Sequence, residues 1–84
     1  MKALRIKDEL HWHDHWSVEL GKRLETRDST NNLLVFSERC SEEDIRGILA
    51  DAPNDLFEII DLEEAPENDC DFMADSGMCY RKLH

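Results

Sequence analysis

The sequence lacks any hydrophobic run long enough to cross a membrane. A bilayer-spanning helix needs about 20 consecutive apolar residues, and no stretch of the 84 residues approaches that length. The first ten residues, MKALRIKDEL, contain too short an apolar stretch for a secretory signal. The sequence therefore predicts a cytoplasmic protein, and its length predicts one domain over residues 1–84 with a small core.

Cysteine is scarce, and the spacing of the cysteines matches no known disulfide framework. The three cysteines are Cys40, Cys70 and Cys79, and no C-x-x-C pair occurs. Because an odd number cannot pair completely within one chain, free thiols in a reducing compartment are expected. A Cys70–Cys79 bridge across a hairpin is the alternative if the chain meets an oxidising environment.

The sequence also contains no motif that indicates a particular catalytic reaction. A chain of 84 residues has no room for a cofactor-binding half and a substrate-binding half, so no cofactor is expected. A Cys–His nucleophile pair depends on spatial adjacency, which sequence spacing does not show. Adjacent acids such as Glu63 and Glu64 are explained by a solvated charged surface. These observations favour a non-enzymatic protein.

Basic residues are almost missing from the second half of the chain, where acids are abundant. The net charge is −10, and residues 1–30 hold six acids and six bases. The window from Glu42 to Asp75 holds thirteen acids, and Arg46 is its one base. A field of one sign over such a length attracts basic partners and repels nucleic acids and anionic membranes. Direct binding of DNA, RNA or a membrane surface is therefore not expected.

The acidic window predicts a surface for a basic protein partner. Its carboxylates can imitate the charge of a nucleic-acid backbone, which carries one negative charge per about 1.7 Å of duplex. The predicted function is to block a nucleic-acid-handling protein, as phage anti-defence inhibitors, antitoxins and immunity proteins of this size and charge do. The alternative is an acidic adaptor or structural protein with ordinary solvated charge. The predicted partner-binding residues are Glu42, Glu43, Asp44, Asp51, Asp55, Glu58, Asp61, Glu63 and Glu64.

The segment HWHDHW, residues 11–16, has two possible secondary structures. With a period of two, the tryptophans share one face and the histidines the other, which favours a strand half-buried through its tryptophans. The alternative is a helix, because Trp12, Trp16, Leu20 and Leu24 are spaced by four. We adopt the strand as the prediction.

The three histidines of this segment raise the question of a metal site. His11, His13 and His15 would lie about 7 Å apart along a strand, so two of them could share a zinc ion. The order H-x-H-D-H is similar to the H-x-H-x-D-H signature of metallo-β-lactamase-like hydrolases, but it is one residue shorter and the chain is too small for that fold. We therefore predict a solvated histidine face without a metal, and keep a small zinc-binding protein as the alternative.

The middle of the chain predicts a turn, a polar segment and a buried strand. Gly21-Lys22-Arg23 is interpreted as a hairpin turn that follows the strand of the histidine segment. The polar residues 28–32 separate this hairpin from the apolar run 33–36, Leu-Leu-Val-Phe, which is long enough for a buried strand.

The second half predicts one helix, a strand and a terminal hairpin. Ser41 is a suitable N-cap with Asp44 three residues on, and Pro53 ends the apolar stripe of the helix. Residues 56–62 favour a strand because of the β-branched Ile-Ile pair, and Asp75-Ser76-Gly77 favours a turn between two final strands. The predicted fold is α+β: an antiparallel sheet of four to five strands with one helix packed on a face.

Overall fold

The fold was analysed in a computed structural model that describes residues 1–30 and 32–83. The described residues form six strands, two α-helices and two short 3₁₀ turns. Residue 31, in the predicted polar segment, lies outside them. The elements are β1 (Lys2–Ile6), α1 (Asp14–Arg23), β2 (Thr26–Ser29), β3 (Leu33–Phe36), α2 (Glu42–Ile48), η1 (Asn54–Leu56), β4 (Phe57–Glu64), η2 (Glu67–Asp69), β5 (Phe72–Met73) and β6 (Cys79–Lys82).

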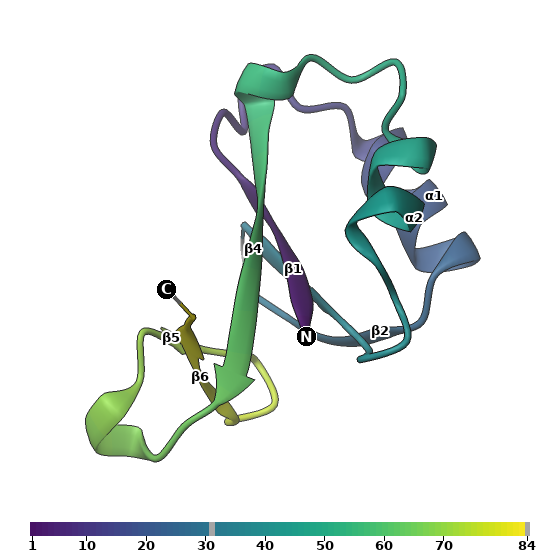
Figure 1. The fold of residues 1–84 in the computed structure, drawn as a ribbon. Coiled ribbons are helices and arrows are strands. Elements are labelled where there is room, and N and C mark those ends of the chain that lie inside the picture. Colours follow the sequence, from purple (N-terminus) through teal and green to yellow (C-terminus); the bar gives the residue numbers. More distant parts are fainter. Residues whose placement is uncertain (31, 84) are drawn as a thin grey trace.

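All pairs of neighbouring strands are antiparallel, in the order β2-β3-β1-β4-β6-β5. The first four strands and both helices follow the β-α-β-β-α-β connectivity of ferredoxin-like folds, in which a strand lies between the two strands joined by each helix. The hairpin of β5 and β6 extends the sheet beyond β4. Both helices lie side by side on the same face of the sheet (Figure 1).

The sheet separates two hydrophobic cores because successive side chains on a strand point to opposite faces. In β1, Leu4 packs under the helices with Trp16 and Leu20, whereas Ala3 faces the other side. The second core lies beneath the C-terminal hairpin, where Tyr80 is fully buried. The central strand β1 is therefore covered on both faces, and the hairpin takes the place that a second layer of helices would otherwise fill.

The sheet curls until the C-terminal hairpin touches the edge strand β2 on the far side. The amide of Asp75 donates to the carbonyl of Ser29 at 3.0 Å. The Asp28 carboxylate accepts hydrogen bonds from the Tyr80 hydroxyl, at 3.1 Å, and from the Ser76 hydroxyl. These contacts join the two ends of the sheet and bury the second core between them.

Several predicted elements are confirmed. The α+β class, the strand over Leu33–Phe36 and the terminal hairpin all occur. The turn of the hairpin contains Gly77 with a φ of 91°, a left-handed conformation that suits glycine. The helix that follows Ser41 has the capping box, in which the Ser41 and Asp44 side chains accept each other's backbone N–H. It ends at Ile48, before the Pro53 that was expected to end it. The strand predicted at residues 56–62 is β4, which runs two residues further.

Other predictions are wrong. Two helices and six strands replace the expected one helix on four to five strands. Only the last three residues of the histidine segment are helical: α1 begins at Asp14, with His13 as its N-cap. The spacing of four within α1 puts Trp16 and Leu20 in the first core, and Trp12 and Leu24, which flank the helix, pack against that core. Gly21-Lys22-Arg23 is consequently the last turn of α1 and no hairpin turn. The strand β1 was not predicted. The strand that the hairpin turn implied after Arg23 overlaps β2, but β2 pairs with β3 and not with the histidine segment.

Candidate functional site

The predicted acids of β4 pair with bases on the neighbouring strands. Directly opposite residues in an antiparallel sheet lie close enough for ion pairs. Asp61 faces Lys2 of β1 with 2.7 Å between carboxylate and ammonium, and Glu58 faces Arg5 in the same way. These two carboxylates are therefore partly neutralised within the chain.

The end of β4 shows the same pairing. Glu63 faces Arg81 of β6. Glu64 reaches Arg27 of β2 across the curled sheet. All four predicted partner-binding acids of β4 thus have local cations, and their contribution to the field around the protein is reduced.

The three predicted acids at the start of α2 have different local roles. Glu42 forms an ion pair with Arg46 one turn later, at 3.0 Å. Asp44 is part of the capping box and accepts from the Ser41 amide at 3.2 Å. Glu43 is exposed, and the described residues provide no ion pair for it. Of these three carboxylates, Glu43 is the one with neither an ion pair nor a capping bond within the described chain.

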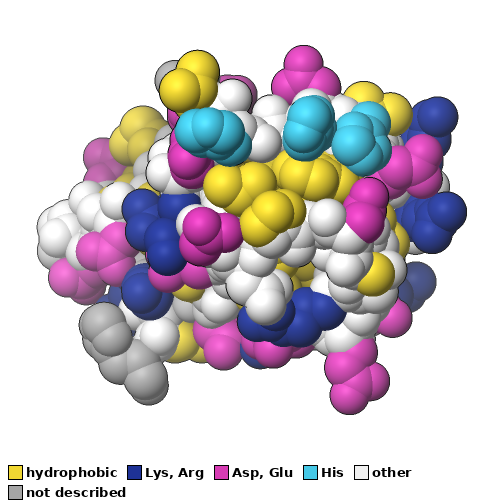
Figure 2. All heavy atoms as spheres, turned by 90° about the horizontal axis from the view of Figure 1, so that it is seen from above, with side chains coloured by type: hydrophobic (Ala, Val, Ile, Leu, Met, Phe, Trp, Pro, Cys, Tyr) yellow, Lys and Arg dark blue, Asp and Glu magenta, His cyan; other side chains and the backbone are white. Residues whose placement is uncertain are grey.

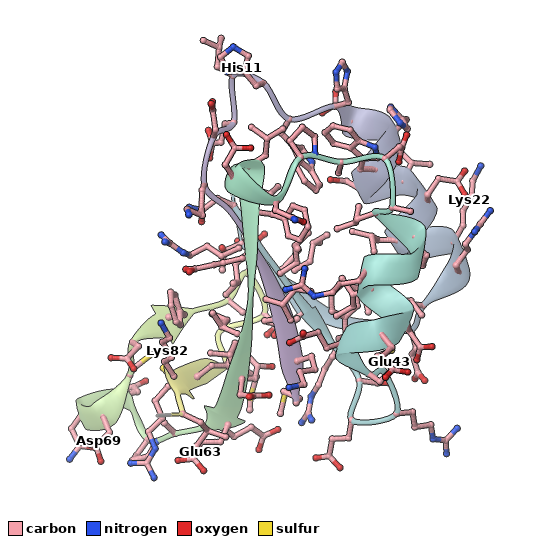
Figure 3. The ribbon with its side chains drawn as sticks, turned by 45° about the horizontal axis from the view of Figure 1, so that its top comes forward. His11, Lys22, Glu43, Glu63, Asp69 and Lys82 are labelled. Atoms are coloured by element: carbon pink, nitrogen blue, oxygen red, sulfur yellow. The ribbon has the colours of Figure 1, made fainter. Side chains whose placement is uncertain are left out.

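Asp51 and Asp55 lie at the other end of the molecule and line a hollow. The loop that joins α2 to β4 meets the loop that joins β1 to α1 around a volume of about 600 Å³. Figure 3 shows His11 at this end, with Glu43 and Glu63 near the opposite end. The residues that line the hollow are Asp8, His11, His13, Trp16, Asp51, Pro53, Asp55 and Leu56.

A second hollow of about 340 Å³ adjoins the first and shares Trp16 and Asp51 with it. It is also lined by His15, Glu19 and Arg23. We call the two hollows together the Trp16 groove. In Figure 2, the histidine side chains form a row beside a hydrophobic area on this end of the molecule, with carboxylates around it.

Trp16 lies beneath the histidines and is 5% exposed. Its ring packs against His13 in a T-shaped arrangement with 4.8 Å between ring centroids, and against His15 at 5.2 Å. The indole Nε1 of Trp16 is buried and has no hydrogen-bond acceptor in the described chain. By contrast, Nε1 of Trp12 donates to the Ser17 hydroxyl at 2.9 Å. A buried unsatisfied donor is rare in native proteins and requires an explanation.

The histidines are exposed and do not converge on one point. His11 contacts the Asp8 carboxylate at 2.8 Å between Nδ1 and Oδ2, and this hydrogen bond holds the pKa of Asp8 below its usual value. His13 and His15 are 5.6 Å apart between ring centroids. Within residues 1–30 and 32–83, no three side chains of His, Cys, Asp or Glu are placed to hold a metal ion. The geometry thus gives no support to the alternative of a zinc site.

The three cysteines are free thiols, as predicted. Cys40 and Cys79 are buried, and Cys70 is half-buried. A hydrogen bond with Cys70 and burial raise the pKa of the Cys79 thiol to about 11. A thiol with a raised pKa carries little thiolate at neutral pH and is a poor nucleophile.

The sequence analysis found the acids of the groove only in part. It identified Asp51 and Asp55 from the acidic window, and it singled out His11, His13 and His15. It missed Asp8, which comes from the balanced first third of the chain, and it did not foresee that Trp16 lines the groove. The spacing of Trp16 and Leu20 by four was the available signal for helix α1, whose start places His13 and Trp16 beside the loop before β4.

Neither helix in the described chain has the length and hydropathy required to cross a lipid bilayer. In comparisons with protein-family models, with curated proteins and with solved structures, no match to this chain was found. A common connectivity does not define a function.

Proposed function

We propose that this protein is a non-enzymatic acidic binder that blocks a basic, nucleic-acid-handling protein by occupying its phosphate-binding surface. The observation that carries the proposal is the excess of carboxylates that remains after the internal ion pairs have formed. Seven of the twenty carboxylates pair with Lys or Arg, and in the described chain the other thirteen do not. Six of the ten Lys and Arg residues are used in those pairs.

This excess supports a binder of cations because unpaired carboxylates set the field that a partner meets. Exposed acids such as Glu43, Asp51 and Asp55 attract a basic surface and accept hydrogen bonds from Arg and Lys. A protein that grips phosphates presents such a surface, and its bases are satisfied by carboxylates in the same way. The competing explanation for the excess of carboxylates is ordinary solvated surface charge, as in an acidic adaptor or structural protein. In that case the carboxylates would not select a basic partner.

The absence of an activated nucleophile in the described site favours binding over catalysis. The larger hollow is lined by carboxylates, imidazoles and apolar side chains, and its described lining contains no Ser, Thr or Cys. The thiol of Cys79 is buried and has a raised pKa. A binder inhibits at one-to-one stoichiometry, whereas an enzyme inactivates its target in substoichiometric amounts and leaves a covalent change.

The proposal is tested by capture of a partner followed by competition with DNA. The immobilised protein should retain a basic protein at low salt, and duplex DNA should displace it, because the two ligands occupy the same surface. Purified partner and inhibitor should then titrate at one to one with no mass change on the partner. A captured protein that binds no nucleic acid, or that DNA does not displace, contradicts the proposal.

Charge variants provide the matched control. Glu43→Gln and Asp51→Asn each neutralise one exposed acid of the window, and each should slow association more than it speeds dissociation, because exposed charges act mainly through steering. Glu25→Gln changes one charge in the balanced first third and should have a smaller effect. Affinity should fall as salt rises from about 50 to about 500 mM, because the Debye length shrinks from about 14 to about 4 Å. Equal, salt-independent binding by all variants contradicts the proposal.

A further inference from the structure

We infer that the Trp16 groove is a socket for an arginine side chain of the basic partner. This inference rests on the proposed function and specifies where one residue of the partner binds. The larger hollow of the groove combines three carboxylates with an apolar floor, and the unsatisfied N–H of Trp16 is buried in one of its lining residues. Each feature restricts which side chain could occupy the hollow.

The carboxylates define the charge of the occupant. Asp8 comes from the loop before α1, and Asp51 and Asp55 come from the loop before β4, so segments far apart in the sequence converge on one hollow. None of the three forms an ion pair with Lys or Arg in the described chain, although Asp8 is bonded to His11 at 2.8 Å. Arg23 lines the adjoining hollow but is paired with Glu19 at 3.2 Å. The larger hollow therefore accepts a cation and excludes an anion.

The floor distinguishes arginine from lysine. Trp16, Pro53 and Leu56 provide apolar surface between the carboxylates. A guanidinium group is planar and weakly hydrated, presents five N–H donors, and tolerates an apolar floor while it bonds to several carboxylates. An ammonium group is compact and strongly hydrated, and it loses more hydration in such a place. The hollow consequently favours arginine.

We take the unsatisfied indole N–H of Trp16 as a second contact of the occupant. Nε1 of Trp16 is buried without a partner in the described chain, although Trp16 lines the hollow. An arginine side chain has donors only, so the acceptor must come from elsewhere in the same ligand. Nε1 has no exposed surface in this structure, so this contact requires the side chains that cover it to move, and the backbone carbonyl of an arginine-containing segment then supplies the acceptor. The inferred ligand is therefore an arginine within a polypeptide and not a free polyamine or a metal ion.

The inference is tested by NMR titration of the ¹⁵N-labelled protein with a blocked Gly-Arg-Gly peptide and, separately, a blocked Gly-Lys-Gly peptide. The indole signal of Trp16 should shift and saturate with the arginine peptide, at a Kd of about 1 mM for so small a ligand. The indole signal of Trp12, already bonded to Ser17, is the internal control and should shift less. The lysine peptide should bind about fivefold more weakly or not at all.

Variants locate the site. Asp51→Asn and Asp55→Asn should each weaken binding of the arginine peptide by about three- to tenfold, because each removes one charged acceptor. Glu38→Gln changes the charge equally but lies in a different hollow, and should leave the peptide affinity unchanged. Melting curves of all three variants establish that they are folded before affinities are compared.

Three results would overturn the inference: no saturable shift of the Trp16 indole, equal affinity for the two peptides, or equal loss in Glu38→Gln and the groove variants. The last two would mean that the acidic surface attracts cations without a socket. These results leave the proposed function standing if DNA still displaces the captured partner. Conversely, arginine binding in the groove without any DNA-competitive partner would overturn the proposed function alone.

Discussion

At the scale of single residues, the Asp28 carboxylate joins the two ends of the curled sheet. It accepts from the Ser29 amide at 3.0 Å, from the Tyr80 hydroxyl at 3.1 Å and from Ser76. Tyr80 is fully buried in the second core, so its hydroxyl depends on this acceptor. The sequence offered no sign of this contact, because residues 28 and 80 are distant along the chain and belong to elements predicted separately.

Removing the Tyr80 hydroxyl should therefore destabilise the protein. Tyr80→Phe keeps the buried ring and loses one hydrogen bond to a charged acceptor, which is worth about 1.5–3 kcal/mol. We expect the free energy of unfolding in urea to fall by about 1–2 kcal/mol, since Ser29 and Ser76 still satisfy Asp28. In an Asp28→Asn background the same substitution should cost less than half as much. Equal costs in both backgrounds would show that the two side chains do not interact.

The carboxylates with native hydrogen bonds should make the protein sensitive to acid. Partial burial acts to raise the pKa of Asp28, but hydrogen bonds from Ser76, Ser29 and Tyr80 outweigh it and hold the pKa below its usual value. The hydrogen bond from Arg5 lowers the pKa of Glu58. A carboxyl group with a lowered pKa in the folded state stabilises that state above its unfolded pKa, near 4, and this contribution is lost as the pH falls through the folded pKa.

We therefore expect the free energy of unfolding to be nearly constant from about pH 7 to about pH 5 and to fall steadily below about pH 4. Urea titrations at a series of pH values measure this dependence. Asp28→Asn should be less stable at pH 7 and should show a shallower decline in acid, because it has one fewer group to protonate. If the free energy of unfolding of Asp28→Asn falls in acid as steeply as that of the parent, Asp28 does not contribute to the acid sensitivity.

At the scale of elements, α2 was predictable because its signals are local. Ser41 and Asp44 are three residues apart, and the capping box needs nothing from the rest of the fold. The helix α1 was mistaken for a strand because residues 12–20 satisfy both periods, and only the position of the first core distinguishes them. The strands β1 and β2 carry charged residues inside short segments, and their pairing with β3 and β4 is a long-range property.

The contribution of the capping box of α2 to the free energy of unfolding should be measurable with single substitutions. Ser41→Ala removes the acceptor for the Asp44 amide, at 3.2 Å, and should lower the free energy of unfolding by about 1 kcal/mol. Ser41→Asn retains a good capping side chain and should restore most of that loss. Thermal unfolding followed by circular dichroism measures both variants. If Ser41→Asn is as unstable as Ser41→Ala, the loss comes from something other than the cap.

At the scale of the whole molecule, the number of acids was predictable but their neutralisation was not. The count of thirteen acids between Glu42 and Asp75 comes directly from the sequence. Which of them face a base depends on the register of β4 against β1 and β6, and that register brings Lys2, Arg5 and Arg81 to its carboxylates. Asp51 and Asp55 lie in the segment between α2 and β4. In the described chain no base on a neighbouring strand pairs with them, so their negative charge is not neutralised.

The balance between these pairs and the excess charge predicts how salt affects stability. The net charge of −10 is held in a molecule of 37 × 27 × 24 Å. At 10 mM salt the Debye length of about 30 Å spans most of the molecule, so carboxylates repel one another throughout it. At 150 mM the Debye length of about 8 Å screens that repulsion, whereas contact pairs such as Lys2–Asp61, at 2.7 Å, lose less. Salt should therefore stabilise the folded protein.

We expect Tm to rise by about 4–8 °C between 10 and 150 mM NaCl, which corresponds to about 1 kcal/mol for a domain of this size. Two variants with the same change of charge separate repulsion from pairing. Glu9→Gln removes an exposed carboxylate without an ion pair in the described chain and should raise Tm at 10 mM salt, whereas Glu63→Gln breaks the pair with Arg81 and should not. The difference between them should shrink at 150 mM, because long-range repulsion is then screened. A Tm that falls with added salt would mean that the ion pairs outweigh the repulsion, and the excess of unpaired carboxylates would then be too weak to govern the approach of a partner.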